Sequence, residues 1–328
     1  MSSPDLIQAY RPLKLPRPLE CDGKLLGSAI PAKIGAVDCR ILFPNAAKDY
    51  FSKFRFVGPI PKYPWPHDGA EVKWGGSFGT DGDQVSAWEC LAVAIEVSGP
   101  ENELGNHSFE LQKSLCAWLA LLQQHHDFRT KLLSSAINVS RTYFDDIHLF
   151  SESQTGWEVH FEPRSNSIRV QIPAEGVDSV QFYEQVNEMI DLASQGNQLT
   201  IELRLLLDAY RARASGDFRR AVIDAATASE VFLNQKIASG LQSLSSEVVE
   251  TILVSLNGLN GKSRFARTLG VSLPTENALN LSGLLRTRNR GLHGGRTPTA
   301  SEVRTALTMA EEILDVSSGV RTEPLKEV

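Results

Sequence analysis

The stretch IELRLLLDAYRARASGDFRRAVIDAATASEVFLNQKIASG, residues 201–240, decides the fold of the C-terminal part of this chain. In its first half, apolar residues recur at helical spacing and are followed by Gly216. In its second half, the same spacing runs from Phe218 to Ile237 and stops before Gly240. Apolar residues three or four positions apart share one helix face, and glycine often follows the end of a helix. The stretch therefore predicts two helices joined by a tight turn.

Helical patterns continue through most of the sequence after this stretch. Thr299 and Glu302 have the spacing of a capping box, directly after Pro298, and start a last helix that runs to about residue 316. The other predicted helices cover residues 246–256, 262–269 and 275–292. Residues 199–320 are therefore predicted to form an all-α domain.

The N-terminal part has a mixed pattern. Residues 1–66 are rich in proline and predict irregular structure with short β-like runs, and residues 74–83 are rich in glycine and predict a turn-rich loop. A long helix is predicted at residues 109–137, and the predicted strands cover residues 36–43, 51–57, 85–97, 157–161 and 167–172, the last two as a hairpin. The sequence thus predicts the α+β class. We expect a mixed α+β domain at residues 1–177, a connecting helix and linker at 178–198, and the helical domain at 199–320.

Composition argues against two broad classes of protein. The 328 residues contain no run of about 18 apolar residues, so we expect no membrane span. The N-terminus lacks a basic segment followed by an apolar stretch, so we expect no secretion signal. The cysteines form no C-x-x-C pair and predict reduced thiols without a zinc site; they are Cys21, Cys39, Cys90 and Cys116. We therefore expect a cytoplasmic protein that needs no metal and no cofactor.

The net charge of −6 is distributed unevenly along the chain. Residues 199–328 hold 16 of the 33 basic and 14 of the 39 acidic residues, a net charge of +2, so the preceding residues carry −8. Four arginines lie within eleven residues that contain no acid; they are Arg286, Arg288, Arg290 and Arg296. Such a local concentration of positive charge attracts phosphate groups, whatever the net charge of the whole chain.

The arginine-rich segment also contains a motif. It reads LLRTRNRGLHGG, residues 284–295, and places Arg288, Asn289 and His293 in the pattern R-N-x-x-x-H. Asn289 and His293 are four positions apart on the predicted helix and share a face, and Arg288 lies roughly 100° around it. A fixed cation, an amide and a titratable imidazole together suit a phosphodiester. A structural interpretation is also open, because arginine and histidine stabilise a helix C-terminus. Gly291 counts against it, since glycine weakens a helix by about 1 kcal/mol relative to alanine.

With this motif, and with Glu230 in the second helix of the domain, residues 199–316 resemble a HEPN domain (higher eukaryotes and prokaryotes nucleotide-binding). That family is an antiparallel helical bundle in which many members carry R-x4-6-H on a late helix, often with asparagine directly after the arginine. Here these positions are Arg288, Asn289 and His293. Members that keep the motif are metal-independent endoribonucleases and work as dimers, whereas other members bind nucleotides or act as interaction modules.

The resemblance implies a specific chemistry for the motif residues. His293 would move the proton of the ribose 2′-hydroxyl or of the departing 5′-oxygen. Arg288 would hold two phosphate oxygens and stabilise the charge of the transition state, and Asn289 would orient His293 or donate to phosphate. The products would be a 2′,3′-cyclic phosphate and a 5′-hydroxyl. Arg286, Arg290 and Arg296 are weaker candidates for phosphate contacts, with solvated surface as the alternative. Glu230 is expected to pair with an arginine of the bundle as structural support.

The resemblance also implies partners. RNA is the expected substrate, and a homodimer is expected to form through the helical domain. Related nucleases act as toxins or antiviral effectors, so an antitoxin or a trigger ligand is an expected partner and the acidic N-terminal domain an expected regulator. Two alternatives stay open. The helical domain is then either a non-catalytic module that binds a nucleotide or a partner protein through Arg288 and His293, or a purely structural oligomerisation domain.

Three other patterns are interpreted as structural. Lys262 follows Gly261 as in a phosphate-binding loop, but the first glycine of that motif and the preceding strand are missing. His125, His126 and Asp127 predict an exposed polar helix end, because adjacent residues on a helix point apart and do not bind one metal. Residues 74–82 lack the following helix that a dinucleotide-binding loop requires.

Overall fold

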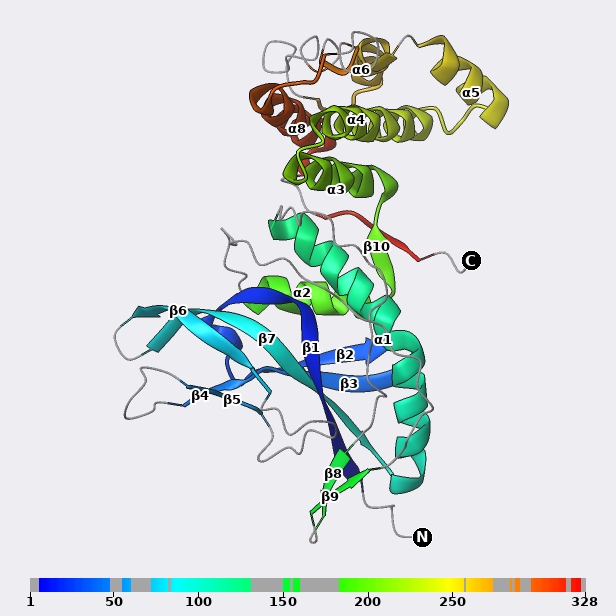
Figure 1. Cartoon of the computed structure of the whole chain (residues 1–328). Coiled ribbons are helices and arrows are strands. Elements are labelled where there is room, and N and C mark those ends of the chain that lie inside the picture. The colour runs from blue at the N-terminus through cyan, green and yellow to red at the C-terminus, as the bar shows by residue number, and fades with distance from the viewer. Residues whose placement is uncertain are drawn as a thin grey trace. The chain divides into compact units, whose positions relative to one another are not determined.

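A computed structural model of the chain describes residues 6–47, 55–59, 72–81, 84–130, 150–153, 156–159, 183–256, 258–273, 284, 287–289, 296–316 and 320–325. It contains helices and antiparallel sheets, so the predicted α+β class is confirmed (Figure 1). The chain divides into two compact units. The first comprises Met1–His126, Ile137–Gln198 and Pro324–Val328, and the second comprises Asp127–Ala136 and Leu199–Glu323.

The first unit is built on an antiparallel sheet whose described strands follow the order β2-β3-β7-β1-β8-β9, with β6 also paired to β7. Its two central strands, β1 (Ile7–Asp22) and β7 (Gln84–Gly99), are sixteen residues long and pair with each other. The other strands are β2 (Ala29–Ile34), β3 (Val37–Leu42), β6 (Gly75–Asp81), β8 (Phe150–Ser153) and β9 (Gly156–Val159). A short 3-10 helix, η1 (Gly23–Leu25), follows β1, and β4 (Asn45–Ala47) forms a separate pair with β5 (Arg55–Val57).

Strand β1 corrects the prediction of irregular structure in the proline-rich N-terminal segment. The register of its pairing with β7 shifts between Lys14 and Leu19, and this interval contains Pro16 and Pro18. Proline has no N–H to donate to a sheet, so it is tolerated where the ladder is irregular. A long strand can therefore pass through a segment whose composition indicates none.

Strand β6 corrects the prediction of a turn-rich loop at residues 74–83. Gly75 has a φ of +150°, and a Cβ built on it would lie 2.0 Å from the carbonyl oxygen of Glu89 in β7. The glycine is thus required because two strands approach closely, which a count of glycines cannot distinguish from a turn. The hairpin predicted at residues 157–172 falls mostly outside the described residues, and the observed β8–β9 hairpin turns earlier, between Ser153 and Gly156.

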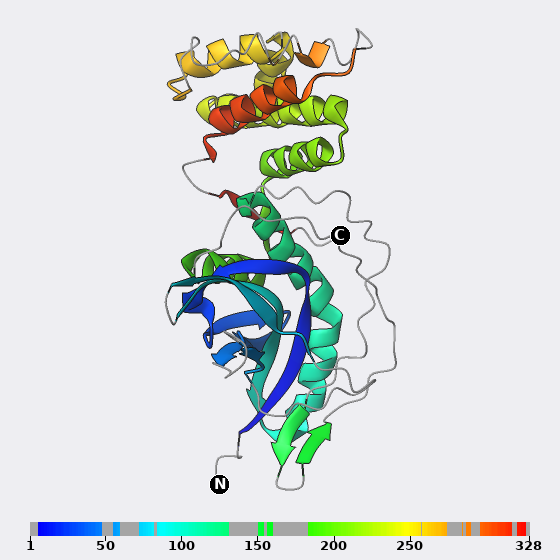
Figure 2. The same ribbon diagram turned by 60° about the vertical axis from the view of Figure 1, so that its left-hand side comes forward.

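Two helices pack against the sheet of the first unit (Figures 1 and 2). Apolar residues of α1 (Glu101–Thr130) and α2 (Tyr183–Ser194) share one core with the sheet residues. Ser194 ties the layers together, since its Oγ accepts hydrogen bonds from the backbone N–H of Lys33 at 3.0 Å and from Nε1 of Trp118 at 3.4 Å. The long predicted helix and the predicted connecting helix are both present, although α1 begins eight residues earlier than expected.

The end of α1 corrects a further prediction. His125, His126 and Asp127 were expected in solvent, but they are 0%, 2% and 0% exposed. Nε2 of His125 lies 2.8 Å from the carbonyl oxygen of Asn197, and Asp127 pairs with Arg211 of the second unit, to which Asp127 itself belongs. The sequence contains a run of polar residues here, but whether these residues are buried depends on the segments that pack over them in the fold.

The second unit is helical around α4. Its described helices are α3 (Ile201–Ala214), α4 (Phe218–Gly240), α5 (Ser246–Ser255), α6 (Gly258–Thr268) and α8 (Ala300–Leu314). Helix α4 contacts each of the other four (Figure 1), and one apolar core is shared by α3, α4, α6 and α8. The predicted capping box is confirmed, because the Thr299 hydroxyl accepts from the backbone of Glu302 and the Glu302 carboxylate accepts from the backbone of Thr299.

Two features complete the fold. Strand β10 (Asn197–Leu199) pairs with β11 (Thr322–Pro324). Among the helices that the structure describes, none is long and apolar enough to cross a membrane.

Candidate functional site

The motif segment is anchored to the second unit through Leu284. The backbone is helical at Leu284 and at Thr287–Asn289, and the side chain of Leu284 is 1% exposed within the apolar core. Arg288 follows Leu284 by four positions in the sequence. Its side chain is 30% exposed, and its Nη2 lies 3.9 Å from Oε2 of Glu230 on α4. Arg288 is therefore held at the margin of the bundle with part of its side chain open to solvent.

Asn289 is exposed to solvent next to Arg288. A helical position one residue after a core-facing side chain points about 100° away, so its exposure follows from helix geometry. His293, Arg286 and Arg290 lie outside the described residues. The expected approach of His293 to Arg288 is therefore still a prediction.

Glu230 has a closer partner than Arg288. Nζ of Lys262, on α6, lies 2.6 Å from Oε1 of Glu230, and the side chains of Lys262 and Glu230 are 10% and 28% exposed. The sequence interpretation expected an arginine partner for Glu230 and treated Lys262 only as part of a false phosphate-binding loop. A signal was present, because Lys262 shares the buried face of α6 with Leu259 and Ala266. A lysine on an apolar helix face requires a buried partner.

One polar atom each of Arg288, of α4 and of α6 makes no hydrogen bond to the residues that the structure describes. They are Nε of Arg288, Oδ1 of Asn234 and Oγ of Ser263, and all three are buried. Asn234 is one helical turn after Glu230, and Ser263 directly follows Lys262. The Nε donor of Arg288 is thus not used by the contact with Glu230, and it is shielded from solvent.

Arg296 is the remaining candidate for a phosphate contact. Its side chain is 54% exposed, and its Nη2 lies 3.3 Å from Oε2 of Glu302, the glutamate of the capping box. Exposed ion pairs contribute little and exchange readily with solvent. Arg296 is therefore accessible, although it already has an acidic neighbour.

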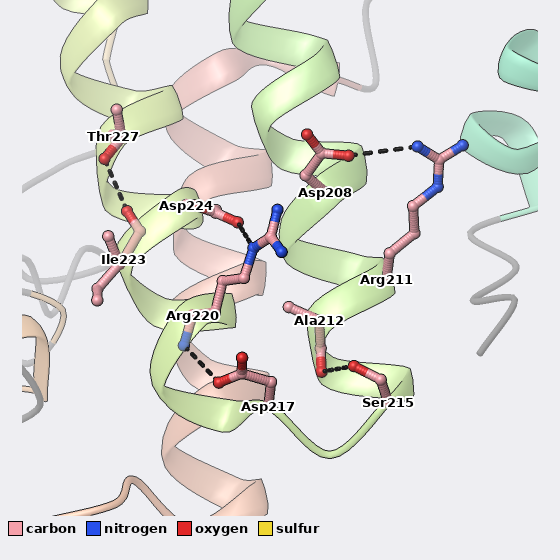
Figure 3. A network of polar contacts seen from close by, with 9 residues as sticks. All are labelled: Asp208, Arg211, Ala212, Ser215, Asp217, Arg220, Ile223, Asp224 and Thr227. Atoms are coloured by element: carbon pink, nitrogen blue, oxygen red, sulfur yellow. Dashed lines mark hydrogen bonds and ion pairs between the residues drawn. The ribbon is translucent and has the colours of Figure 1, made fainter. Parts of the chain in front are cut away.

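A second polar network lies where α3 turns into α4 (Figure 3). Arg211 bridges Asp208 at 3.2 Å and Asp127 at 3.1 Å, and Arg220 points along α4 to Asp224 at 3.2 Å. Burial raises the pKa of Asp224, the nearby Arg220 lowers it, and the negative charges of Asp208 and Asp217 raise it. Each arginine here already faces a carboxylate, and the named aspartates outnumber the two arginines, so the network does not present positive charge to a phosphate. No group of three or more metal-binding side chains occurs among the described residues.

Buried polar contacts inside the bundle are structural. Tyr210 of α3 donates a hydrogen bond to Glu311 of α8, and the pKa of Tyr210 is raised mainly by burial and further by Glu311. Glu202, which is 2% exposed, accepts from Thr200 at 2.6 Å and from Arg321 at 3.3 Å. These contacts join α3 to α8 and Glu202 to the C-terminal segment, and Nη2 of Arg321 has no hydrogen-bond partner among the described residues.

The four cysteines are free, as expected, and three of them are buried. Burial raises the pKa of Cys39 to about 12, with a smaller contribution from Asp38, and burial also raises the pKa of Cys21, Cys90 and Cys116. A thiol must ionise to act as a nucleophile, so these cysteines are poor candidates for catalysis at neutral pH.

The sequence matches no family model, and neither a curated protein nor a solved structure is similar to it at a significant level. The HEPN resemblance therefore rests on the motif residues and on the helical unit that carries them.

Proposed function

We propose that the second unit is a metal-independent endoribonuclease of the HEPN type. The observation that carries the proposal is the position of Arg288. The motif arginine is held beside Glu230 of α4, four positions after the buried Leu284, and its side chain is 30% exposed. A cation that is held in place yet open to solvent is what an anionic polymer requires of a phosphate contact.

The proposed chemistry divides the work among three residues. Arg288 binds two non-bridging oxygens of the scissile phosphate and stabilises the charge that develops on them. His293 accepts the 2′-hydroxyl proton or protonates the departing 5′-oxygen. Asn289, exposed beside Arg288, donates to the phosphate or orients the imidazole. Since the nucleophile belongs to the ribose, the products are a 2′,3′-cyclic phosphate and a 5′-hydroxyl, and DNA is not cut.

The proposal extends to assembly and control. We propose a cytoplasmic homodimer through the helical unit, which acts as a toxin or antiviral effector under restraint by the N-terminal part. The acidic balance of −8 before residue 199 supports such a restraint, because negative charge repels RNA. A trigger ligand would relieve this restraint, and an antitoxin would impose it.

The test is cleavage of end-labelled RNA by the purified full-length chain in excess chelator. Arg288→Ala and His293→Ala should each reduce the cleavage rate by at least about a hundredfold, the range for losing one general acid–base or charge-stabilising group. Arg304→Ala is the matched control, because Arg304 is an exposed arginine on α8. RNA binding without cleavage would instead support the non-catalytic module, and cleavage that survives both substitutions would refute the assigned site.

The regulatory part of the proposal needs a deletion that respects the observed units. Asp127 and Phe128 belong to the second unit, where Phe128 is 4% exposed in the core and Asp127 pairs with Arg211. A deletion should therefore remove Met1–His126 and Ile137–Gln198 and keep Asp127–Ala136 joined to Leu199, since removal of every residue up to 198 would also remove core contacts of the second unit. RNA cleavage and growth inhibition should rise in this variant, and unchanged values of both would contradict the regulatory role.

A further inference from the structure

We infer that Lys262 is a positioning residue that keeps Arg288 available to phosphate by neutralising Glu230. The inference rests on the proposed function, and it assigns a role in phosphate binding to a residue outside the motif. It starts from the fact that Lys262 and Arg288 share one carboxylate.

The two cations share Glu230 unequally. The contact of Lys262 with Oε1 is 2.6 Å, a short charge-assisted hydrogen bond, whereas Arg288 lies 3.9 Å from Oε2, beyond hydrogen-bond distance. The carboxylate of Glu230 is therefore paired mainly with Lys262. Two positive charges and one negative charge leave a net charge of +1 in this cluster of described residues, and it resides on the guanidinium.

Burial separates the roles of the two cations. The side chain of Lys262 is only 10% exposed, between α4 and α6, while that of Arg288 is 30% exposed. A phosphate on a large polyanion can reach the arginine more easily than the enclosed ammonium group. The effect of Lys262 on RNA is therefore expected to pass through Glu230 and not through a contact of its own.

The consequence of losing Lys262 follows from the same geometry. A half-buried carboxylate without its hydrogen-bond donor takes the nearest cation, because an unpaired buried charge is costly. Within the described part of the chain, Arg288 is the other cation within 4.0 Å of Glu230. The guanidinium fork matches a carboxylate as well as a phosphate, so Glu230 would close onto Arg288 and compete with RNA.

The test measures binding of a fluorescent 2′-O-methyl oligoribonucleotide, which lacks the nucleophile, to the full-length chain at several salt concentrations. Lys262→Met should weaken binding about tenfold and lower the slope of log affinity against log salt by about 0.7, the value of one phosphate contact on a single strand. Arg288→Ala should lower the slope by the same amount. Lys236→Met is the matched control, because Lys236 is an exposed lysine on α4 that lies over the ring of Phe232.

The decisive variant is the double substitution Glu230→Gln with Lys262→Met. Removing the competing carboxylate should restore the slope of the wild type, although Lys262 is still missing. If the double variant binds as weakly as Lys262→Met, or if Lys262→Met keeps the wild-type slope, the inference is overturned. If Lys262→Met does not fold, Glu230→Gln alone decides: it should bind at least as tightly as the wild type, and weaker binding overturns the inference.

The outcome for the nuclease proposal can be read separately. A wild type that binds the uncleavable oligonucleotide with a slope that depends on Lys262, yet leaves ordinary RNA intact, refutes the nuclease and supports the positioning role. A wild type that cuts RNA while the Lys262→Met variant binds normally refutes the positioning role alone. A wild type that does not bind the oligonucleotide at all refutes both.

Discussion

The substitution Leu284→Ala tests whether the motif segment is anchored as described. The side chain of Leu284 is 1% exposed and belongs to the apolar core of the second unit, four positions before Arg288 in the sequence. Truncation would remove this anchor and leave a cavity in the core. The substitution should therefore lower the stability of the second unit and make the position of the Arg288 guanidinium, which the proposed chemistry requires, less well defined.

The expected magnitude follows from this burial. Replacing a buried leucine with alanine costs about 2–5 kcal/mol, so we expect a loss of about 3 kcal/mol and a fall of roughly 10 °C in the melting temperature of the second unit. Val254→Ala is the matched control, because Val254 on α5 is 79% exposed and its truncation should change stability by less than about 0.5 kcal/mol.

The assay can distinguish the two units. All five tryptophans precede residue 199, so tryptophan fluorescence reports unfolding of the first unit, whereas much of the helical circular dichroism comes from the second. Leu284→Ala should shift the dichroism transition and leave the fluorescence transition in place. A shift no larger than that of Val254→Ala, or an equal shift of both signals, would refute the anchoring of this segment in the core of the second unit.

Two further predictions concern the interior of the second unit. Glu202→Ala should lower the free energy of unfolding in urea by about 3 kcal/mol, because it leaves the guanidinium of Arg321 without its carboxylate. Adding Arg321→Met should recover part of this loss. Equal losses in the single and the double variant would contradict the pairing. Burial, and then Glu311, raise the pKa of Tyr210 above its ordinary value of 10.0. Above pH 10 the folded state therefore keeps a proton that the unfolded state releases. The contribution of Tyr210 to stability is present below pH 10 and is lost as the pH rises above it. Tyr210→Phe should accordingly lose less stability than the wild type between about pH 9 and about pH 11, and parallel losses in urea unfolding would count against the prediction.

Local signals predicted much of the second unit. The apolar spacing that indicated α3 and α4, and the spacing of Thr299 and Glu302 that indicated the start of α8, both arise within a few helical turns. Interactions of this kind connect residues three or four positions apart, so they can be read from one stretch of sequence. The candidate residues Arg288 and Asn289 were found in the same way, as members of a short motif.

Contacts between distant segments could not be predicted in this way. The hydrogen bond between Glu230 and Lys262 joins residues 32 positions apart, and the ion pair between Asp127 and Arg211 joins residues 84 positions apart. Strand β1 also escaped prediction, since its prolines argue against a strand until the irregular pairing with β7 is known.

The sequence by itself determined the α+β class, the helices of the second unit and a motif suited to a phosphodiester. Only the tertiary structure decided that Lys262 pairs with the carboxylate of Glu230 and that the side chain of Arg288 is partly exposed. The physical reason is that helical periodicity and capping are set by neighbouring residues, whereas the charge that a side chain presents to a ligand depends on which distant groups fold against it.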